Sequence, residues 1–336
     1  MREIVIVIAD LYLPHGANGT GAAVPGAVPG IESAGRFGER AALQHGWREW
    51  LAHALGREDL AGVAPACIAA AAAEAAPGGA PAGAAIGTPW IATPLQLTAG
   101  AARLYLDYRG VLRLPRAELA ALAAAFQDTF AVSGFTLRPL ASGDFLLRTP
   151  GIAAVATTEP ARCAGTDVAE ALPRGAAAAP LRRLVAEIEM WLHGQALNEA
   201  RVRRGEPPVT TLWPWGAEGR AVQPERREAG ATLRAFGADP YVHGLWQLQG
   251  GVCRALPQRL EDVLADEHAG GVVLVLTLAQ SLAHLDARFV SPALKALRRG
   301  EVSSVTLIAN DTRVTLRRRS HLRLWRRMRA GLRSFA

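Results

Sequence analysis

The residues best suited to chemistry lie close together between Asn198 and Trp215. Asn198, Arg201 and Arg204 recur at intervals of three, so a helix would place an amide and two guanidinium groups along one side. The planar fork of arginine matches the oxygens of phosphates and carboxylates, so this spacing predicts a site for an anion. A solvated helix face is the alternative. Trp213 and Trp215 follow, and they either stack on a ligand or anchor a loop in the core.

Histidines supply one further candidate for ligand binding, His243, in the turn-rich segment 239–244. His193 is expected near the end of a helix, where the negative end of the helix dipole gives it a structural role. The other histidines lack a spacing such as His-Glu-x-x-His, which would place two zinc ligands on one helix face.

The first predicted strand ends in an acid. Residues 3–10 read Glu-Ile-Val-Ile-Val-Ile-Ala-Asp, a continuous β-branched run that is typical of a buried parallel strand. Ligands collect at the carboxyl ends of such strands, so Asp10 is a candidate metal or substrate ligand. Its other interpretation is a cap for the turn that follows. Neither Gly-x-Gly-x-x-Gly nor Gly-x-x-x-x-Gly-Lys-Ser/Thr occurs there, so no phosphate-binding loop for a nucleotide is expected.

Strands and helices alternate along the rest of the chain. The patterns predict helices at residues 36–55, 116–130, 181–197 and 286–297, and strands at 209–213, 271–278 and 304–309. Residues 64–74 are Ala-rich and are expected to form a buried helix or a strand–helix element. Such alternation favours an α/β fold with a mostly parallel sheet in three layers.

The residue pattern changes between residues 88 and 159, and it predicts a small inserted α+β subdomain there. It contains two strands, a helix and a hairpin around residues 142–144. The expected organisation is therefore a core from residues 1–87 and 160–313, the insert at 88–159, and a tail at 314–336.

The composition is that of a globular protein. The chain has 336 residues, of which 50% are hydrophobic and 20% charged. It has no apolar run of about 18 residues and no signal peptide, so a soluble, cytoplasmic protein is expected. Cys67, Cys163 and Cys253 lie far apart, which indicates neither a disulfide framework nor a zinc knuckle.

The formal charge of +7 is concentrated at one end. Eight arginines lie between Arg317 and Arg333, and no acid follows Asp311, so the rest of the chain is close to neutral. Residues 315–335 carry an apolar stripe among these arginines and are expected to form a basic amphipathic helix. Such a helix either docks on its own domain or contacts a polyanion such as nucleic acid or a membrane surface.

Residues 193–216 resemble a known family. The run His193-Gly-Gln-Ala-Leu-Asn198-Glu-Ala-Arg201, followed by Arg204-Gly-Glu-Pro-Pro-Val-Thr-Thr-Leu-Trp213-Pro-Trp215-Gly, is similar to an element of bacterial proteins described as uncharacterised or as regulatory proteins of RpfE type. That family is a distant relative of the archaeal-type cofactor-independent phosphoglycerate mutases in the alkaline phosphatase superfamily. The resemblance implies an alkaline-phosphatase-like fold.

Departures from the superfamily pattern imply lost catalysis. An active member needs two metal ions, held by Asp and His, beside a Ser or Thr that takes the phosphoryl group. Here Leu11 follows Asp10 where a Gly and a second Asp are usual. Residues 310–312 read Asn-Asp-Thr where Asp-His is expected, and residues 280–284 contain no carboxylate. The resemblance thus implies a non-catalytic protein without a cofactor, which binds an anionic metabolite or a protein partner in a regulatory role.

An active metal-dependent phosphotransferase, of mutase or phosphatase type, is the alternative. Asp10, Asp286 and Asp311 would then be the remaining carboxylates that bind Mn²⁺, Zn²⁺ or Mg²⁺, with Asp10 and Asp311 in catalytic roles. This alternative requires the three carboxylates to converge within the reach of two metal ions, which lie about 4 Å apart in such centres.

Overall fold

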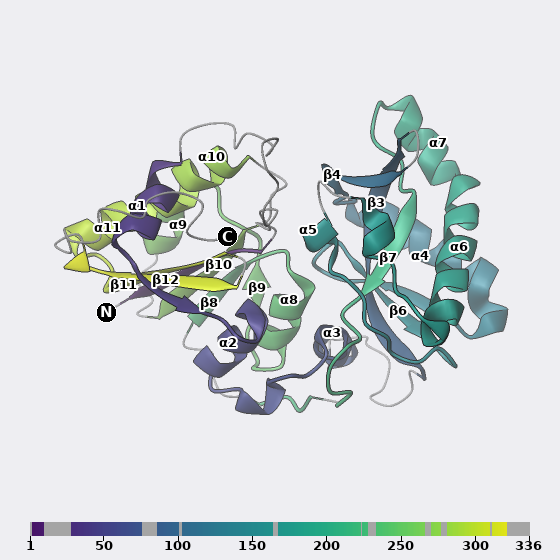
Figure 1. The fold of residues 1–336 in the computed structure, drawn as a ribbon, viewed down its shortest axis with the longest axis horizontal. Helices are drawn as coiled ribbons and strands as arrows, with labels where there is room; N and C mark the ends of the chain where they lie inside the picture. Colours follow the sequence, from purple (N-terminus) through teal and green to yellow (C-terminus); the bar gives the residue numbers. More distant parts are fainter. Residues whose placement is uncertain are drawn as a thin grey trace. The chain divides into compact units, whose positions relative to one another are not determined.

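The computed structural model describes residues 2–9, 28–75, 86–100, 103–163, 167–222, 224–227, 233–265, 270–276, 281–309 and 311–320. Two compact units make up the chain (Figure 1). The first comprises Met1–Ala61, Ala229–Ala238 and Gly250–Ala336, and the second comprises Gly62–Glu228 and Asp239–Gln249. Among the described helices, none combines the length and the apolar character that crossing a membrane requires.

The first unit is built on a seven-stranded sheet in the order β2-β12-β11-β1-β10-β8-β9. Strand β1 lies between β10 and β11 and runs parallel to both, with Ile6 opposite Leu274 and Leu307. The buried parallel strand predicted at the start of the chain is therefore confirmed. The strands are β1 (Glu3–Ile8), β2 (Glu39–Ala42), β8 (Leu233–Gly237), β9 (Cys253–Arg254), β10 (Gly271–Leu276), β11 (Ser304–Ala309) and β12 (Thr312–Arg317).

Helices cover one face of this sheet (Figure 1). They pack on Ile4, Ile6 and Ile8, while Val5 and Val7 on the opposite face are also buried, as is usual for parallel strands. The helices in this apolar cluster are α1 (Pro29–Phe37), α9 (Leu260–Leu264), α10 (Leu282–Leu285), the π-helical turn Asp286–Val290 and α11 (Ser291–Arg299).

The helix predicted at residues 36–55 is wrong in its first half. Helix α1 ends at Phe37, β2 follows, and α2 (Gly46–Ala54) begins only after a turn. Gly46 has a φ of 76°, a left-handed conformation that glycine adopts at little cost. The helix predicted at residues 286–297 is real but begins earlier, at Leu282.

An antiparallel sheet organises the second unit. It contains five strands in the order β4-β3-β6-β5, with β7 paired to β3. The parallel arrangement predicted for the fold thus holds for most strands of the first unit only. The strands are β3 (Thr88–Ala99), β4 (Leu104–Val111), β5 (Thr136–Pro139), β6 (Phe145–Thr149) and β7 (Thr211–Trp215).

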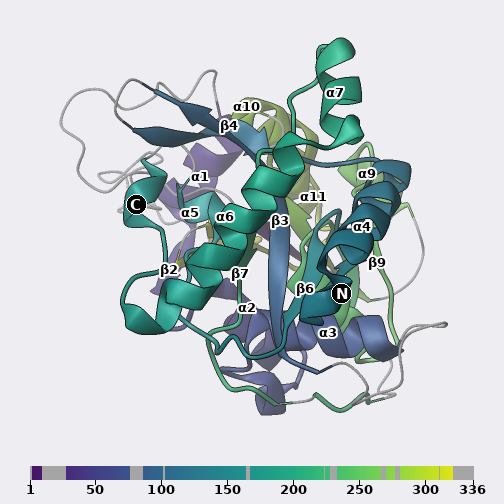
Figure 2. The same cartoon turned by 90° about the vertical axis from the view of Figure 1, so that its right-hand side faces the viewer.

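Two long helices lie on one face of this sheet, α4 (Arg116–Phe130) and α6 (Ala179–His193) (Figure 2). Their apolar stripes meet Trp90, Phe145 and Leu212 from the strands. The other face packs on α3 (Pro65–Ala75) and α5 (Pro160–Cys163). Helix α8 (Pro240–Gln247) contacts α3 within the same unit, since Gly244 lies against the backbone of Ile68.

The second unit is larger than the insert predicted at residues 88–159. Its extra strand, β7, comes from residues outside that range and pairs with β3 over five positions, Thr93 opposite Trp213. The predicted helix at residues 181–197 is divided, because α6 ends at His193 and α7 (Ala196–Arg203) begins after Gly194.

Candidate functional site

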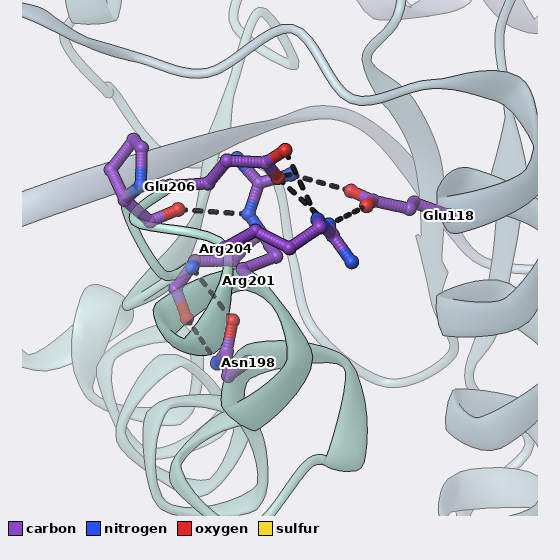
Figure 3. Close-up of polar contacts among 7 residues, drawn as sticks. Glu118, Asn198, Arg201, Arg204 and Glu206 are labelled. Atoms are coloured by element: carbon purple, nitrogen blue, oxygen red, sulfur yellow. Dashed lines mark hydrogen bonds and ion pairs between the residues drawn. The ribbon is translucent and has the colours of Figure 1, made fainter.

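Asn198 ties together the segment that leads from α6 to β7 (Figure 3). It is 8% exposed, and its Nδ2 donates hydrogen bonds of 2.8 Å to the carbonyl oxygens of Leu192 and Val209. Its Oδ1 accepts a third, also 2.8 Å, from the Val209 N–H. Because both ends of the amide are occupied by backbone, Asn198 holds the chain in place.

Arg201 and Arg204 face two carboxylates (Figure 3). Arg201 is 6% exposed; it donates to Glu118 at 2.5 Å and to the Pro207 carbonyl at 2.8 Å. Arg204 is exposed and donates to Glu118 at 2.6 Å and to Glu206 at 2.7 Å. The Arg204 hydrogen bond lowers the pKa of Glu206.

This network gives partners within the protein to the side chains at residues 198, 201 and 204, where an anion site is expected. The two guanidinium charges are balanced by Glu118, from the first turn of α4, and by Glu206. Asn198 is directed at backbone groups instead of at a shared ligand. The polar groups of these three side chains join α7 to α4, to the end of α6 and to the segment that precedes β7.

Trp213 and Trp215 are both buried in β7. The Trp215 indole N–H donates to Thr93 Oγ1 at 2.9 Å, and that hydroxyl donates to Asp144 at 2.7 Å. The Trp213 indole N–H donates to the Thr158 carbonyl at 2.8 Å. Trp215 therefore belongs to the core, whereas Trp213 also borders a cavity.

The cavity lies in the second unit, against α6 and β7, and has a volume of about 170 Å³. Its walls come mainly from apolar side chains, and its rim includes Ala186, which is exposed. The lining consists of Leu97, Leu104, Thr157, Val168, Leu172, Pro173, Arg182, Val185, Ala186, Glu189, Trp213 and Pro214.

Glu189 is the acidic group in this lining. Burial raises the pKa of its carboxyl, and the neighbouring Thr211 hydroxyl opposes only part of that rise. Burial and this hydroxyl are the two causes that act on the pKa. Arg182, also in the lining, donates instead to the carbonyl oxygens of Pro173 at 2.8 Å and Gly175 at 3.2 Å.

A second polar group in the lining is the hydroxyl of Thr157. Its Oγ1 is buried and has no hydrogen-bond partner among the described residues. An apolar cavity with a few polar groups is the usual form of a small-molecule site. The sequence did not single out Glu189; the available signal was its position beside Ile188 at the edge of the buried stripe of α6.

Asp286 has a structural role in the first unit. It is 1% exposed and accepts hydrogen bonds from the N–H groups of Gly30 at 3.0 Å and Ile31 at 2.7 Å, and from Ser291 Oγ at 2.9 Å. These N–H groups belong to the first turn of α1. The backbone N–H groups of a first turn have no acceptor within their own helix, so Asp286 supplies one. A Cβ on Gly30 would lie 2.6 Å from Asp286 Oδ1, so glycine permits this close approach.

Asp311 lies in the tight turn between β11 and β12, where Ala309 pairs with Thr312. It is exposed, and its carbonyl oxygen accepts a hydrogen bond of 2.7 Å from the Leu43 N–H. Asp10 lies outside the described residues, so the convergence of the three carboxylates stays a prediction. Within the described parts of the chain, no three His, Cys, Asp or Glu side chains form a group that could hold a metal.

The remaining candidates are placed as follows. His243 is partly buried in α8, a helix capped by Asp239, which accepts from the Val242 N–H at 3.1 Å. His193 is exposed at the end of α6. The predicted tail helix is wrong at its start, because residues 315–317 belong to β12; residues 321–336 lie outside the described part of the chain.

Comparison with known proteins gives distant likenesses of fold. No family model matches the chain, and no curated protein matches it. Among solved structures, a cofactor-independent phosphoglycerate mutase from Thermoplasma acidophilum is 14% identical, with a TM-score of 0.37 over 94% of this chain and 90% of that one. The PH0037 protein from Pyrococcus horikoshii is 11% identical, with a TM-score of 0.45 over 94% and 86%.

Proposed function

We propose that the chain is a non-catalytic binding protein with a regulatory role, and that its ligand occupies the cavity at α6 and β7. The cavity carries this proposal, because it combines apolar walls with a partly buried carboxyl and a buried, unpaired hydroxyl. Small-molecule sites are built in this way, with apolar walls for affinity and a few polar groups for orientation.

An anionic metabolite at Arg201 and Arg204 is the weaker form of the proposal. An anion there would have to displace Glu118, which binds both guanidinium groups. Removing one partner from a buried ion pair is costly, because the other charge stays buried without compensation. The arginine network therefore supports the framework of the second unit.

The non-catalytic part of the proposal is supported by Asp286. Both of its carboxylate oxygens already accept hydrogen bonds, which leaves this side chain occupied by α1 and Ser291. The resemblance of residues 193–216 to RpfE-type regulatory proteins, together with the departures at residues 10–11 and 310–312, agrees with it.

The alternative, an active phosphotransferase, is favoured by one observation. Strands β1, β10 and β11 are parallel, so their carboxyl ends share one edge of the sheet, the usual place for ligands. Asp10 comes two residues after Ile8, and Asp311 two residues after Ala309, the last residues of β1 and β11.

Turnover assays on the purified full chain separate the two functions. Phosphomonoester hydrolysis and phosphoglycerate interconversion would be measured with Mn²⁺, Zn²⁺ and Mg²⁺, and we expect no metal-dependent turnover. Asp286→Asn should lower the melting temperature, because an amide N–H would then face backbone N–H groups. Metal-dependent turnover that disappears in Asp10→Ala would refute the proposal.

A further inference from the structure

We infer that the cavity binds a small primary amine, whose apolar part fills the space beside Trp213 and Pro214 and whose ammonium group pairs with Glu189. This inference rests on the proposed function and assigns a chemical class to its ligand.

The size and walls of the cavity define the apolar part of the ligand. Its volume of about 170 Å³ is slightly above that of an engineered apolar cavity of ~150 Å³ that binds benzene. Leu97, Val168, Val185 and Pro214 supply aliphatic walls, and Trp213 supplies an aromatic one. One ring, or a short branched chain, matches this space.

The charge of the ligand follows from Glu189. Desolvation disfavours the ionised form of a carboxyl, and a nearby cation restores it. The guanidinium of Arg182, in the same lining, donates to the Pro173 and Gly175 carbonyls, and the raised pKa of Glu189 has burial as its main cause. A ligand ammonium beside Glu189 would supply an opposite charge, whereas a ligand carboxylate or phosphate at that position would face a like charge.

The hydrogen-bonding capacity of the lining favours a primary amine in particular. An ammonium group has three N–H donors and no acceptor. The Glu189 carboxylate and the unpaired Thr157 Oγ1 both line the cavity and both accept hydrogen bonds. A hydrogen bond to a charged group is about twice as strong as one between neutral groups, so the amine gains most at Glu189.

Benzylamine, benzyl alcohol and benzoate make a matched set of probes, alike in ring and differing in charge. Binding of each to the full chain would be measured by isothermal titration calorimetry and by ligand-observed nuclear magnetic resonance at neutral pH. Three variants complete the design. Glu189→Gln removes the charge at nearly constant shape, Ala186→Phe fills the rim of the cavity, and Glu187→Gln removes an exposed carboxylate of the same helix that is outside the lining.

The expected result is that the wild type binds benzylamine about tenfold or more tightly than benzyl alcohol, and benzoate not at all. Glu189→Gln should abolish the preference for the amine, Glu187→Gln should retain it, and Ala186→Phe should weaken both amine and alcohol. Circular dichroism would verify that each variant is folded.

Two other results would overturn either the amine assignment alone or the proposed function as well. Equal binding of amine and alcohol, weakened by Ala186→Phe, would overturn the amine assignment and leave the cavity as the binding site. Absence of binding by every probe, or binding that Ala186→Phe does not change, would overturn both the assignment and the proposed function.

Discussion

Replacing Asn198 by Asp exchanges one NH₂ group for an oxygen and removes two hydrogen bonds. Nδ2 of Asn198 lies 2.8 Å from the carbonyl oxygens of Leu192 and Val209, so the carboxylate would face two acceptors at the same distance. A buried polar group left without a partner costs about 1–3 kcal/mol, and here two carbonyls and a new charge are affected. We therefore expect Asn198→Asp to lower the free energy of unfolding of the second unit by about 4 kcal/mol at neutral pH.

Two comparisons sharpen this prediction. Asn198→Ala removes all three hydrogen bonds but adds no charge, so we expect a loss of about 3 kcal/mol. Glu199→Gln changes the exposed next residue of α7 and should stay within about 0.5 kcal/mol of the wild type. Because a protonated carboxyl can donate to one carbonyl, the defect of Asn198→Asp should shrink at low pH.

The assay has to report on the second unit, since two units need not unfold together. Urea denaturation followed by tryptophan fluorescence gives the overall change, and hydrogen exchange at the Val209 amide gives the local one. That amide donates to Asn198 Oδ1, so its protection should fall most in Asn198→Ala. If Asn198→Asp and Asn198→Ala were as stable as Glu199→Gln, the structural role assigned to this side chain would be refuted.

Two further predictions concern the charged groups of the second unit. Since the folded-state pKa of Glu189 is raised above its ordinary value of 4.5, the folded protein holds this proton more tightly, and the carboxyl loses stabilising effect as pH rises through the raised pKa. In thermal scans at pH 8, Glu189→Gln should thus have a higher melting temperature than the wild type. This difference should vanish below pH ~4. An unchanged melting temperature at pH 8 would contradict the burial of Glu189. Glu118→Gln should cost about 2 kcal/mol in urea denaturation, because it leaves the buried Arg201 undercompensated. Glu206→Gln should cost clearly less, because Glu206 is exposed and its ion pairs are screened by solvent. Equal costs for these two variants would argue against a buried pair.

Three strands of the first unit could be predicted because their signal is local. Residues 3–8, 271–276 and 304–309 are runs of β-branched and aliphatic residues, and the structure places them side by side as parallel strands. A parallel strand buried on both faces needs apolar residues at every position, and this requirement is visible in a single sequence.

The position of β7 could not be obtained in that way. A strand was predicted at residues 209–213, close to the observed Thr211–Trp215, but its partner in the sheet is β3, more than 100 residues earlier in the chain. Antiparallel pairing depends on which strand is available in space, and β-propensity carries no information on that choice.

The roles of the candidate site residues also depend on partners that are distant in sequence. Asn198, Arg201 and Arg204 could be recognised as unusual from their spacing, but their roles depend on Glu118, which lies 83 residues before Arg201. The cavity was missed because its wall combines α6 with Leu97, Leu104 and Thr157, all distant in sequence. Local patterns therefore identified the segment, and tertiary contacts determined its role.

Anomalous diffraction from crystals of the full chain, grown with Mn²⁺ and inorganic phosphate, tests the central claim most directly. The claim is that this chain binds a ligand at α6 and β7 and does not perform phosphoryl transfer. We predict no pair of manganese ions at the carboxyl edge of β1, β10 and β11. Two such ions about 4 Å apart, coordinated by Asp10 and Asp311 with phosphate between them, would contradict the account.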